Sequence, residues 1–151
     1  MTRPPAGDPR PPRHAPTGGG HSMNTVTFRI PPRLWLTSNR HHADRKHRAA
    51  IVRELHEVAG WAIRQAHLTP HTSPVRVEWT VHYPKGVRLD KGEASNAQPT
   101  TKALLDAAVS LGVLTDDGPR WVLSETFQRG PNLTIRGEHH ITLTIREEPP
   151  A

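Results

Sequence analysis

The 151-residue chain carries 20 Lys and Arg against 14 Asp and Glu, a formal net charge of +6, with 11 His and no Cys. The missing cysteine excludes disulfides and thiolate metal sites, and no apolar run reaches the ~18 residues needed to cross a membrane. We therefore expect a soluble protein of the cytoplasm. Its basic surplus favours a polyanion partner, most often nucleic acid, although basic proteins without such a partner also exist.

The first 22 residues, MTRPPAGDPRPPRHAPTGGGHS, hold 6 of the 16 prolines and 4 of the 11 glycines. A segment with so little to bury cannot offset the entropy of ordering, so we expect a disordered tail. It lacks the apolar stretch of a signal peptide. Met23 opens a strand-like run and is a second candidate start, and residues 23–148 are predicted to form one domain.

Hydrophobic periodicity predicts a strand and then a long helix in the first half of the domain. Residues 24–30 alternate as a half-buried strand, which Pro31 and Pro32 end because proline cannot donate to a β-ladder. Asp44 is a candidate N-cap for a helix that reaches about Ala66. The expected apolar side of this helix consists of Ile51, Leu55, Val58, Ala62 and Ala66.

The second half is predicted to add a strand, a helix and two further strands. Residues 75–83 alternate cleanly, residues 84–96 form an irregular charged loop, and a helix spans about 100–111. The apolar stripe of that helix is expected to be Leu104, Ala108 and Leu111, with Gly112 as its C-terminal stop. Strands follow near 120–127 and 139–146. The order β-α-β-α-β-β indicates an α/β or α+β domain, in which two main helices pack on a small mixed sheet.

Carboxylates flank the second helix at Glu93, Asp116 and Asp117, and Lys102 lies near its start. Hard cations such as Mg²⁺ prefer oxygen ligands, usually one or two carboxylates plus water and substrate phosphates. Taken alone, an Asp-Asp pair before Gly118-Pro119 is more often plain turn chemistry, and a lysine one turn into a helix is more often an exposed surface residue. The two adjacent histidine pairs, His41-His42 and His139-His140, are interpreted as surface residues, because neighbours on a strand point to opposite faces.

Four common motifs of nucleotide-binding proteins and hydrolases are missing. The sequence lacks GxxxxGK[ST], GxGxxG, GxSxG and HExxH, so nucleotide hydrolysis, dinucleotide binding, serine hydrolysis and a zincin site have no support.

The order of these pieces resembles the RusA family of Holliday junction resolvases, small dimeric endonucleases, over about residues 23–147. The likeness includes the opening strand with its Pro-Pro and SNR loop, and is strongest in NAQPTTKALLDAAVSLGVLTDDGPRWV at 96–122. The family pattern there is D-x-D-N, a helix with an early Lys, a KAxxDAL-like run, a G-[VF]-[LW] turn and an Asp-Asp pair. The residues that match it in order are Lys102, Asp106, Gly112, Asp116 and Asp117.

The resemblance implies a Mg²⁺ site, with Mn²⁺ as an alternative ion. Asn96 matches the Asn of D-x-D-N, which places Glu93 and Ser95 at its two aspartates. The implied metal ligands are Glu93, Asp116 and Asp117. The implied catalytic residues are Glu93, Lys102 and Asp117, with Lys102 as the phosphate-contacting cation.

Ser95 departs from the family pattern, because a neutral hydroxyl is a poor Mg²⁺ ligand. Asp90, or a backbone carbonyl with water, would have to fill the missing position. Three functions therefore stay open. They are a metal-dependent junction endonuclease, a catalytically weakened junction-binding protein on the same fold, and a basic nucleic-acid-binding module unrelated to resolvases.

The resemblance also implies branched DNA as the partner and a homodimer as the assembly. A four-way junction has near two-fold symmetry, so a C₂ dimer would place one site against each of two opposed strands. The side chains expected to contact DNA phosphates are Arg45, Arg48, Lys85, Arg88, Lys91 and Lys102.

Overall fold

The computed structural model describes residues 23–39 and 44–149. The expected tail at 1–22 and the His41-His42 pair lie outside the described residues. The order of elements is β1 (Met23–Ile30), η1 (Pro32–Leu34), α1 (Arg45–Ala66), β2 (Val75–His82), η2 (Ala94–Ala97), α2 (Gln98–Ser110), β3 (Val122–Arg129) and β4 (His139–Glu147). The predicted succession of strands and helices is therefore confirmed.

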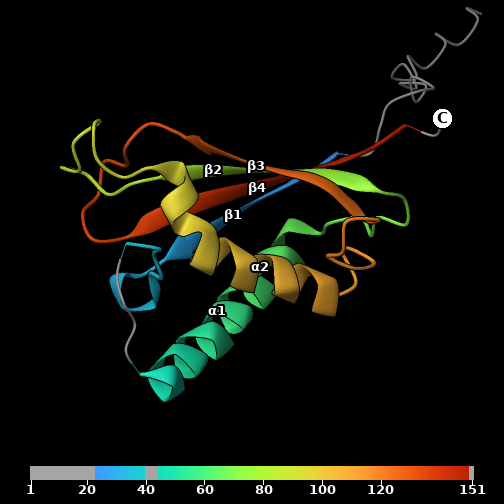
Figure 1. The fold of residues 1–151 in the computed structure, drawn as a ribbon, viewed down its shortest axis with the longest axis horizontal. Helices are drawn as coiled ribbons and strands as arrows, with labels where there is room; N and C mark the ends of the chain where they lie inside the picture. The colour runs from blue at the N-terminus through green and yellow to red at the C-terminus, as the bar shows by residue number, and fades with distance from the viewer. Residues whose placement is uncertain (1–22, 40–43, 150–151) are drawn as a thin grey trace, which may run out of the picture.

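The four strands form one mixed sheet in the order β1-β4-β2-β3. Strand β4 pairs antiparallel with both β1 and β2, whereas β2 and β3 are parallel. A parallel pair needs a crossover connection, and α2 supplies it between β2 and β3. Both helices lie on one side of the sheet (Figure 1). The predicted fold class, a small mixed sheet carrying two main helices, is confirmed.

The limits of α1 follow from local chemistry. The Asp44 side chain accepts a hydrogen bond from the Lys46 backbone N–H at 2.9 Å, as expected of an N-cap. His67 ends the helix in a left-handed conformation with φ 50°. Its buried side differs from the predicted one, because Ala66 is exposed and Val58 and Ala62 are only half-buried. The residues that face the core are Ile51, Leu55, Ala59, Gly60 and Ile63.

Helix α2 begins two residues earlier than predicted, directly after η2. Pro99 stands in its first turn, where a fixed φ suits a helix and the missing N–H would have no partner. Gly112 follows the helix with φ 78°, which confirms it as the stop. Leu111 is 41% exposed, so its predicted place in the apolar stripe is wrong. The stripe instead continues through Leu105 and Ala107.

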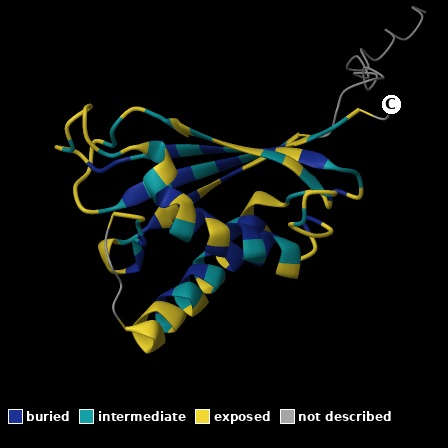
Figure 2. Cartoon of the chain, viewed as in Figure 1, coloured by how far each residue is buried: buried dark blue, intermediate teal, exposed yellow. Residues whose placement is uncertain are grey.

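The core fills the space between the inner face of the sheet and the two helices. In β2, β4 and most of β1, alternate residues are buried, which is the period expected of a sheet covered on one face. Figure 2 shows this buried layer, with exposed positions on the outer sides of both helices. The largest fully buried side chains include Trp79, Phe28, Leu55, Leu104 and Leu143. Within the described residues, no helix is both long and apolar enough to span a bilayer.

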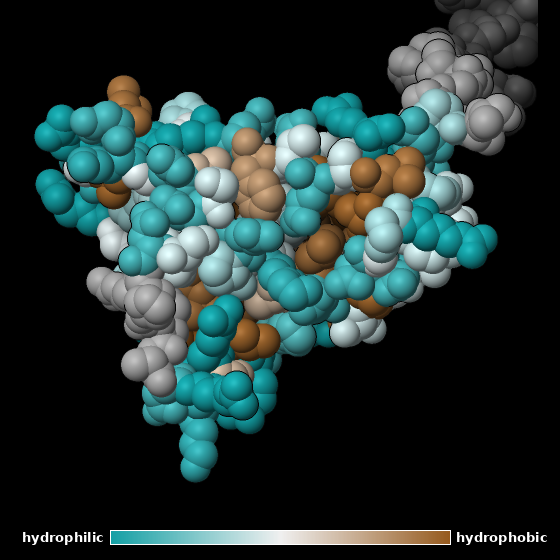
Figure 3. All heavy atoms as spheres, viewed as in Figure 1, coloured by the Kyte–Doolittle hydropathy of each residue, from teal (hydrophilic) through white to brown (hydrophobic). Residues whose placement is uncertain are grey.

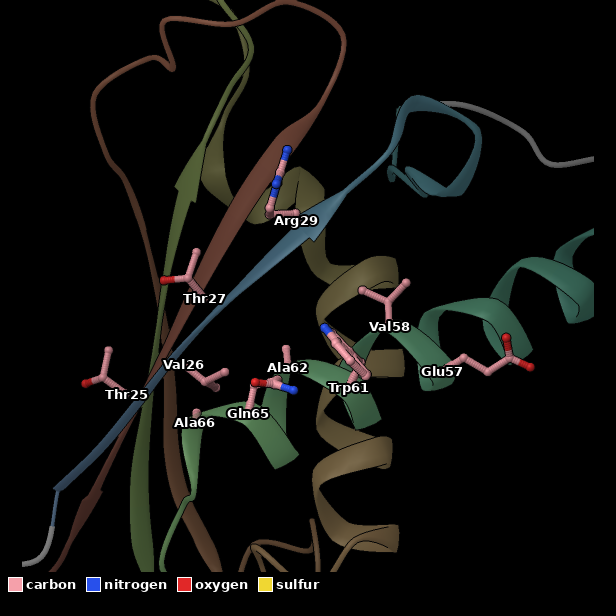
Figure 4. Close-up of a pocket in the computed structure, with 10 residues that line it drawn as sticks. All are labelled: Thr25, Val26, Thr27, Arg29, Glu57, Val58, Trp61, Ala62, Gln65 and Ala66. Atoms are coloured by element: carbon pink, nitrogen blue, oxygen red, sulfur yellow. The ribbon is translucent and has the colours of Figure 1, made fainter.

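The visible surface is mainly hydrophilic, with a few separate patches of hydrophobic side chains (Figure 3). A hollow of about 720 Å³ lies between β1 and α1 (Figure 4). Trp61 borders it and is 67% exposed. None of the predicted site residues lines this hollow.

Candidate functional site

A cluster of charged side chains on the outer face of α2 contains part of the predicted site. The Lys102 ammonium lies 3.7 Å from Asp106 Oδ1, one helical turn further along, and 3.9 Å from Asp117 Oδ2. Asp117 also donates its backbone N–H to Asp116 Oδ1 at 2.9 Å. We call these four residues the Lys102 cluster. The structure thus brings together the predicted lysine and the predicted Asp-Asp pair, and adds Asp106.

The Lys102 cluster is open to solvent. The Lys102 side chain is 68% exposed, and those of Asp106 and Asp117 are 40% and 39% exposed. Ion pairs this exposed contribute typically ~0.2–1 kcal/mol, because water screens them. The ion pairs of these three charged groups therefore add little to the free energy of unfolding. They are free to exchange partners with a solvent cation or a phosphate.

Helix α1 contributes one predicted DNA-contacting residue to the same region. Arg48 and Val52 line a shallow pocket of about 190 Å³ together with Lys102 and Asp106. This places a second cation beside the Lys102 cluster. Arg45 lies one turn earlier on α1 and is exposed.

Glu93 and Ser95 lie before α2 and are both exposed. Glu93 immediately precedes η2, and its backbone carbonyl accepts hydrogen bonds from the Tyr83 hydroxyl at 2.7 Å and the Asn96 N–H at 3.2 Å. Asp90, the suggested substitute for the missing ligand, forms an ion pair with Arg88 at 2.8 Å. In the described residues, no group of three or more His, Asp or Glu is arranged to hold a metal ion. The three-carboxylate set of Glu93, Asp116 and Asp117 stays a prediction.

The basic loop before Glu93 is tied to the ends of the strands. Arg129 Nε donates to the Gly92 carbonyl at 3.0 Å, and Asn132 Nδ2 donates to the Val87 carbonyl at 2.5 Å. The Lys85 N–H donates to the Ile135 carbonyl at 2.7 Å. The predicted phosphate-contacting side chains of this loop, Lys85, Arg88 and Lys91, are all exposed.

The prediction for His139 is wrong. Strand alternation puts its side chain on the inner face of β4, where only 9% of the residue is exposed, whereas His140 points to the other face. His139 stacks on Trp35 with ring centroids 3.6 Å apart and planes within 4°. Burial lowers the pKa of His139 to about 4, so the ring is neutral at physiological pH. Its Nδ1 atom is buried and has no hydrogen-bond partner among the described residues.

Tyr83 completes an aromatic group with Trp35 and His139 that the sequence analysis did not single out. The Tyr83 ring meets that of Trp35 edge-on at 6.0 Å, and the Arg129 guanidinium lies 4.9 Å from its centroid. Burial raises the pKa of Tyr83, which keeps its hydroxyl protonated as a hydrogen-bond donor. The period-2 pattern of β4 predicts an inward His139, but nothing local indicates that Trp35 lies against it.

No model of a known protein family matches the sequence, and a search of curated proteins also gave no match. The resemblance to RusA resolvases therefore rests on the residues already described.

Proposed function

We propose that this protein is a RusA-like, metal-dependent endodeoxyribonuclease that cleaves four-way DNA junctions, and that it acts in the cytoplasm. The observation that carries the proposal is the position of the Lys102 ammonium between the carboxylates of Asp106 and Asp117 on an exposed helix face. The order of these residues along the chain is that of the family pattern.

The donors of the Lys102 cluster suit a hard dication. Asp116 and Asp117 are adjacent, exposed carboxylates, and Mg²⁺ commonly binds through one or two carboxylates while retaining water and phosphate ligands. When bound, such an ion activates water and stabilises charge on the phosphate. Mn²⁺ would be bound by the same oxygen ligands.

The residues of the chain have separate tasks in this proposal. Asp116 and Asp117 would hold the cation, with Glu93 as the third ligand that the resemblance to the family implies. With a cation held by Asp116 and Asp117, the neighbouring Lys102 ammonium would contact the scissile phosphate as a point charge. Arg48 supports the same phosphate from α1.

Affinity for DNA is assigned to the exposed basic side chains rather than to the metal. Arg45 and Arg48 on α1, and the loop residues Lys85, Arg88 and Lys91, would neutralise phosphates and release counterions. A homodimer is part of the proposal, because two copies related by a two-fold axis match the symmetry of a four-way junction.

The decisive experiment is a single-turnover nicking assay on a synthetic four-way junction, with and without Mg²⁺. We expect Mg²⁺-dependent nicking that is abolished in Asp117→Asn, because an amide replaces a charged ligand. Glu57→Gln, an exposed carboxylate on α1 outside the Lys102 cluster, is the matched control and should cut normally. Nicking that is unchanged in Asp117→Asn would show that this cluster is not the active site.

A second candidate, a junction-binding protein with little or no cleavage, is favoured by Ser95. This neutral residue stands where the family motif has an aspartate. Under this alternative, the wild-type protein binds a four-way junction more tightly than linear duplex in a gel shift. It does not nick the junction in Mg²⁺ or Mn²⁺.

A further inference from the structure

A pocket of about 330 Å³ lies beside the loop that leads into Glu93, separate from the Lys102 cluster. It is formed by the segment after β1, the end of β2 and the turn before α2. The residues that line it are Pro32, Trp35, Thr37, Asn39, Tyr83, Gly92 and Asn96. Its volume is at the lower end of the range for small-ligand sites.

Hydrogen bonds fix the walls of this pocket. The Thr100 hydroxyl donates to the Leu36 carbonyl at 2.8 Å and accepts from the Leu36 N–H at 3.0 Å, which ties the segment after β1 to the first turn of α2. The Ser38 N–H donates to the Asn96 carbonyl at 3.1 Å. On the opposite wall, a Cβ at Gly92 would lie 2.7 Å from the Tyr83 ring, so the loop passes the ring as closely as glycine allows.

Aromatic rings supply part of the lining, and they are held rigidly. Trp35 lines the pocket and is fixed by its stack on His139. Tyr83 lines it too and is anchored through its hydroxyl to the Glu93 carbonyl. A preformed site of this kind does not have to order its side chains when a planar ring binds.

Two asparagine side chains, Asn39 and Asn96, add polar groups to the lining. The side-chain amides of Asn39 and Asn96 form no hydrogen bond with other residues that the structure describes, and the Asn39 backbone N–H donates to the Thr37 hydroxyl at 3.4 Å. An amide offers a donor and an acceptor side by side. That pair matches the edge of a nucleobase, as in recognition of adenine by asparagine.

We propose that this pocket binds the base of an unpaired deoxynucleotide at a DNA branch point. Stacking against aromatic rings and pairing with amides are the two contacts by which proteins hold an unstacked base. Two basic residues adjoin the Gly92 wall of the pocket, since Arg129 donates a hydrogen bond to the Gly92 carbonyl and Lys91 precedes that glycine. The inference rests on the proposed action on junctions, and it adds a contact that distinguishes open branch points from continuous duplex.

The test compares two four-way junctions that carry one unpaired nucleotide at the branch, either intact or lacking its base. Fluorescence anisotropy of the labelled junctions, in Ca²⁺ to prevent cleavage, gives both affinities. We expect the wild-type protein to bind the intact junction about tenfold more tightly, the size expected for one stacked base. In the Asn39→Ala/Asn96→Ala double variant this preference should fall below about twofold, with affinity for the abasic junction unchanged.

Two further variants separate loss of the pocket from loss of the fold. Thr37→Leu fills the pocket with an apolar side chain and should also remove the preference, while near-ultraviolet circular dichroism stays that of the wild type. Gln65→Ala, an exposed change on α1, should leave the preference intact. Equal affinity of the wild-type protein for the two junctions would overturn the inference and leave the nuclease proposal standing. Failure to bind either junction would overturn both.

Discussion

Replacing His139 by phenylalanine should remove a large part of the acid sensitivity of the fold. Burial lowers the pKa of His139 to about 4, whereas an unfolded chain has its ordinary value of 6.5. Between pH 6.5 and pH 4 the unfolded state binds a proton that the folded state does not bind. The free energy of unfolding therefore falls as the pH drops from 6.5 towards 4, and it is constant below that. The full difference corresponds to about 3 kcal/mol, and about 2 kcal/mol is already lost at pH 5.

Urea unfolding near pH 8 and near pH 5 measures this loss. A phenyl ring keeps an aromatic face against Trp35 and does not titrate, so His139→Phe should lose about 2 kcal/mol less than the wild type between the two pH values. The exposed His47→Gln is the control and should follow the wild type. If His139→Phe loses as much stability as the wild type, His139 is charged in the folded protein and the reasoning from its burial is refuted.

Four other outcomes are expected. Affinity for a four-way junction should drop steeply as salt rises, and an affinity insensitive to salt would exclude phosphate contacts as its source. Thr100→Val should lower the free energy of unfolding by about 1–3 kcal/mol, because it leaves both backbone groups of Leu36 without partners, while Thr100→Ser should retain most of the stability. Ser95→Asp should increase Mg²⁺-dependent nicking, and an unchanged rate would separate position 95 from the metal. A chain that begins at Met23 should fold and stay in the supernatant after centrifugation. Loss of the soluble protein would contradict this prediction.

The elements that the sequence predicted well are those specified by neighbouring residues. The cap at Asp44 and the stop at Gly112 depend on local backbone geometry. The alternation of buried and exposed residues in β2 and β4 follows because only one face of the sheet is covered by helices. By contrast, η2 was expected as irregular loop, because a single turn after a charged segment has no period to detect. Leu111 was misassigned because the last residue of a helical pattern has no further turn to cover it.

The candidate site was only partly predictable for a different reason. The pairing of Lys102 with Asp106 is an i,i+4 contact that helical spacing alone predicts. The approach of Asp117 depends on how the loop after α2 turns back along the helix, which no local pattern specifies. The stack of Trp35 on His139 joins residues more than a hundred positions apart. Such contacts are set by the order of strands in the sheet, which the periodicity left undetermined.

That strand order has a consequence for synthesis of the protein. Strand β4 is the last element of the chain, yet it lies inside the sheet and pairs with both β1 and β2. At ~5–20 residues per second, β1 emerges from the ribosome roughly 6–25 seconds before β4 is complete. Through that interval the backbone N–H and C=O groups of β1 have no strand to pair with, because β4 is its neighbour in the described sheet. The pairing of β1 into the sheet therefore waits for the synthesis of β4, after both helices have been made.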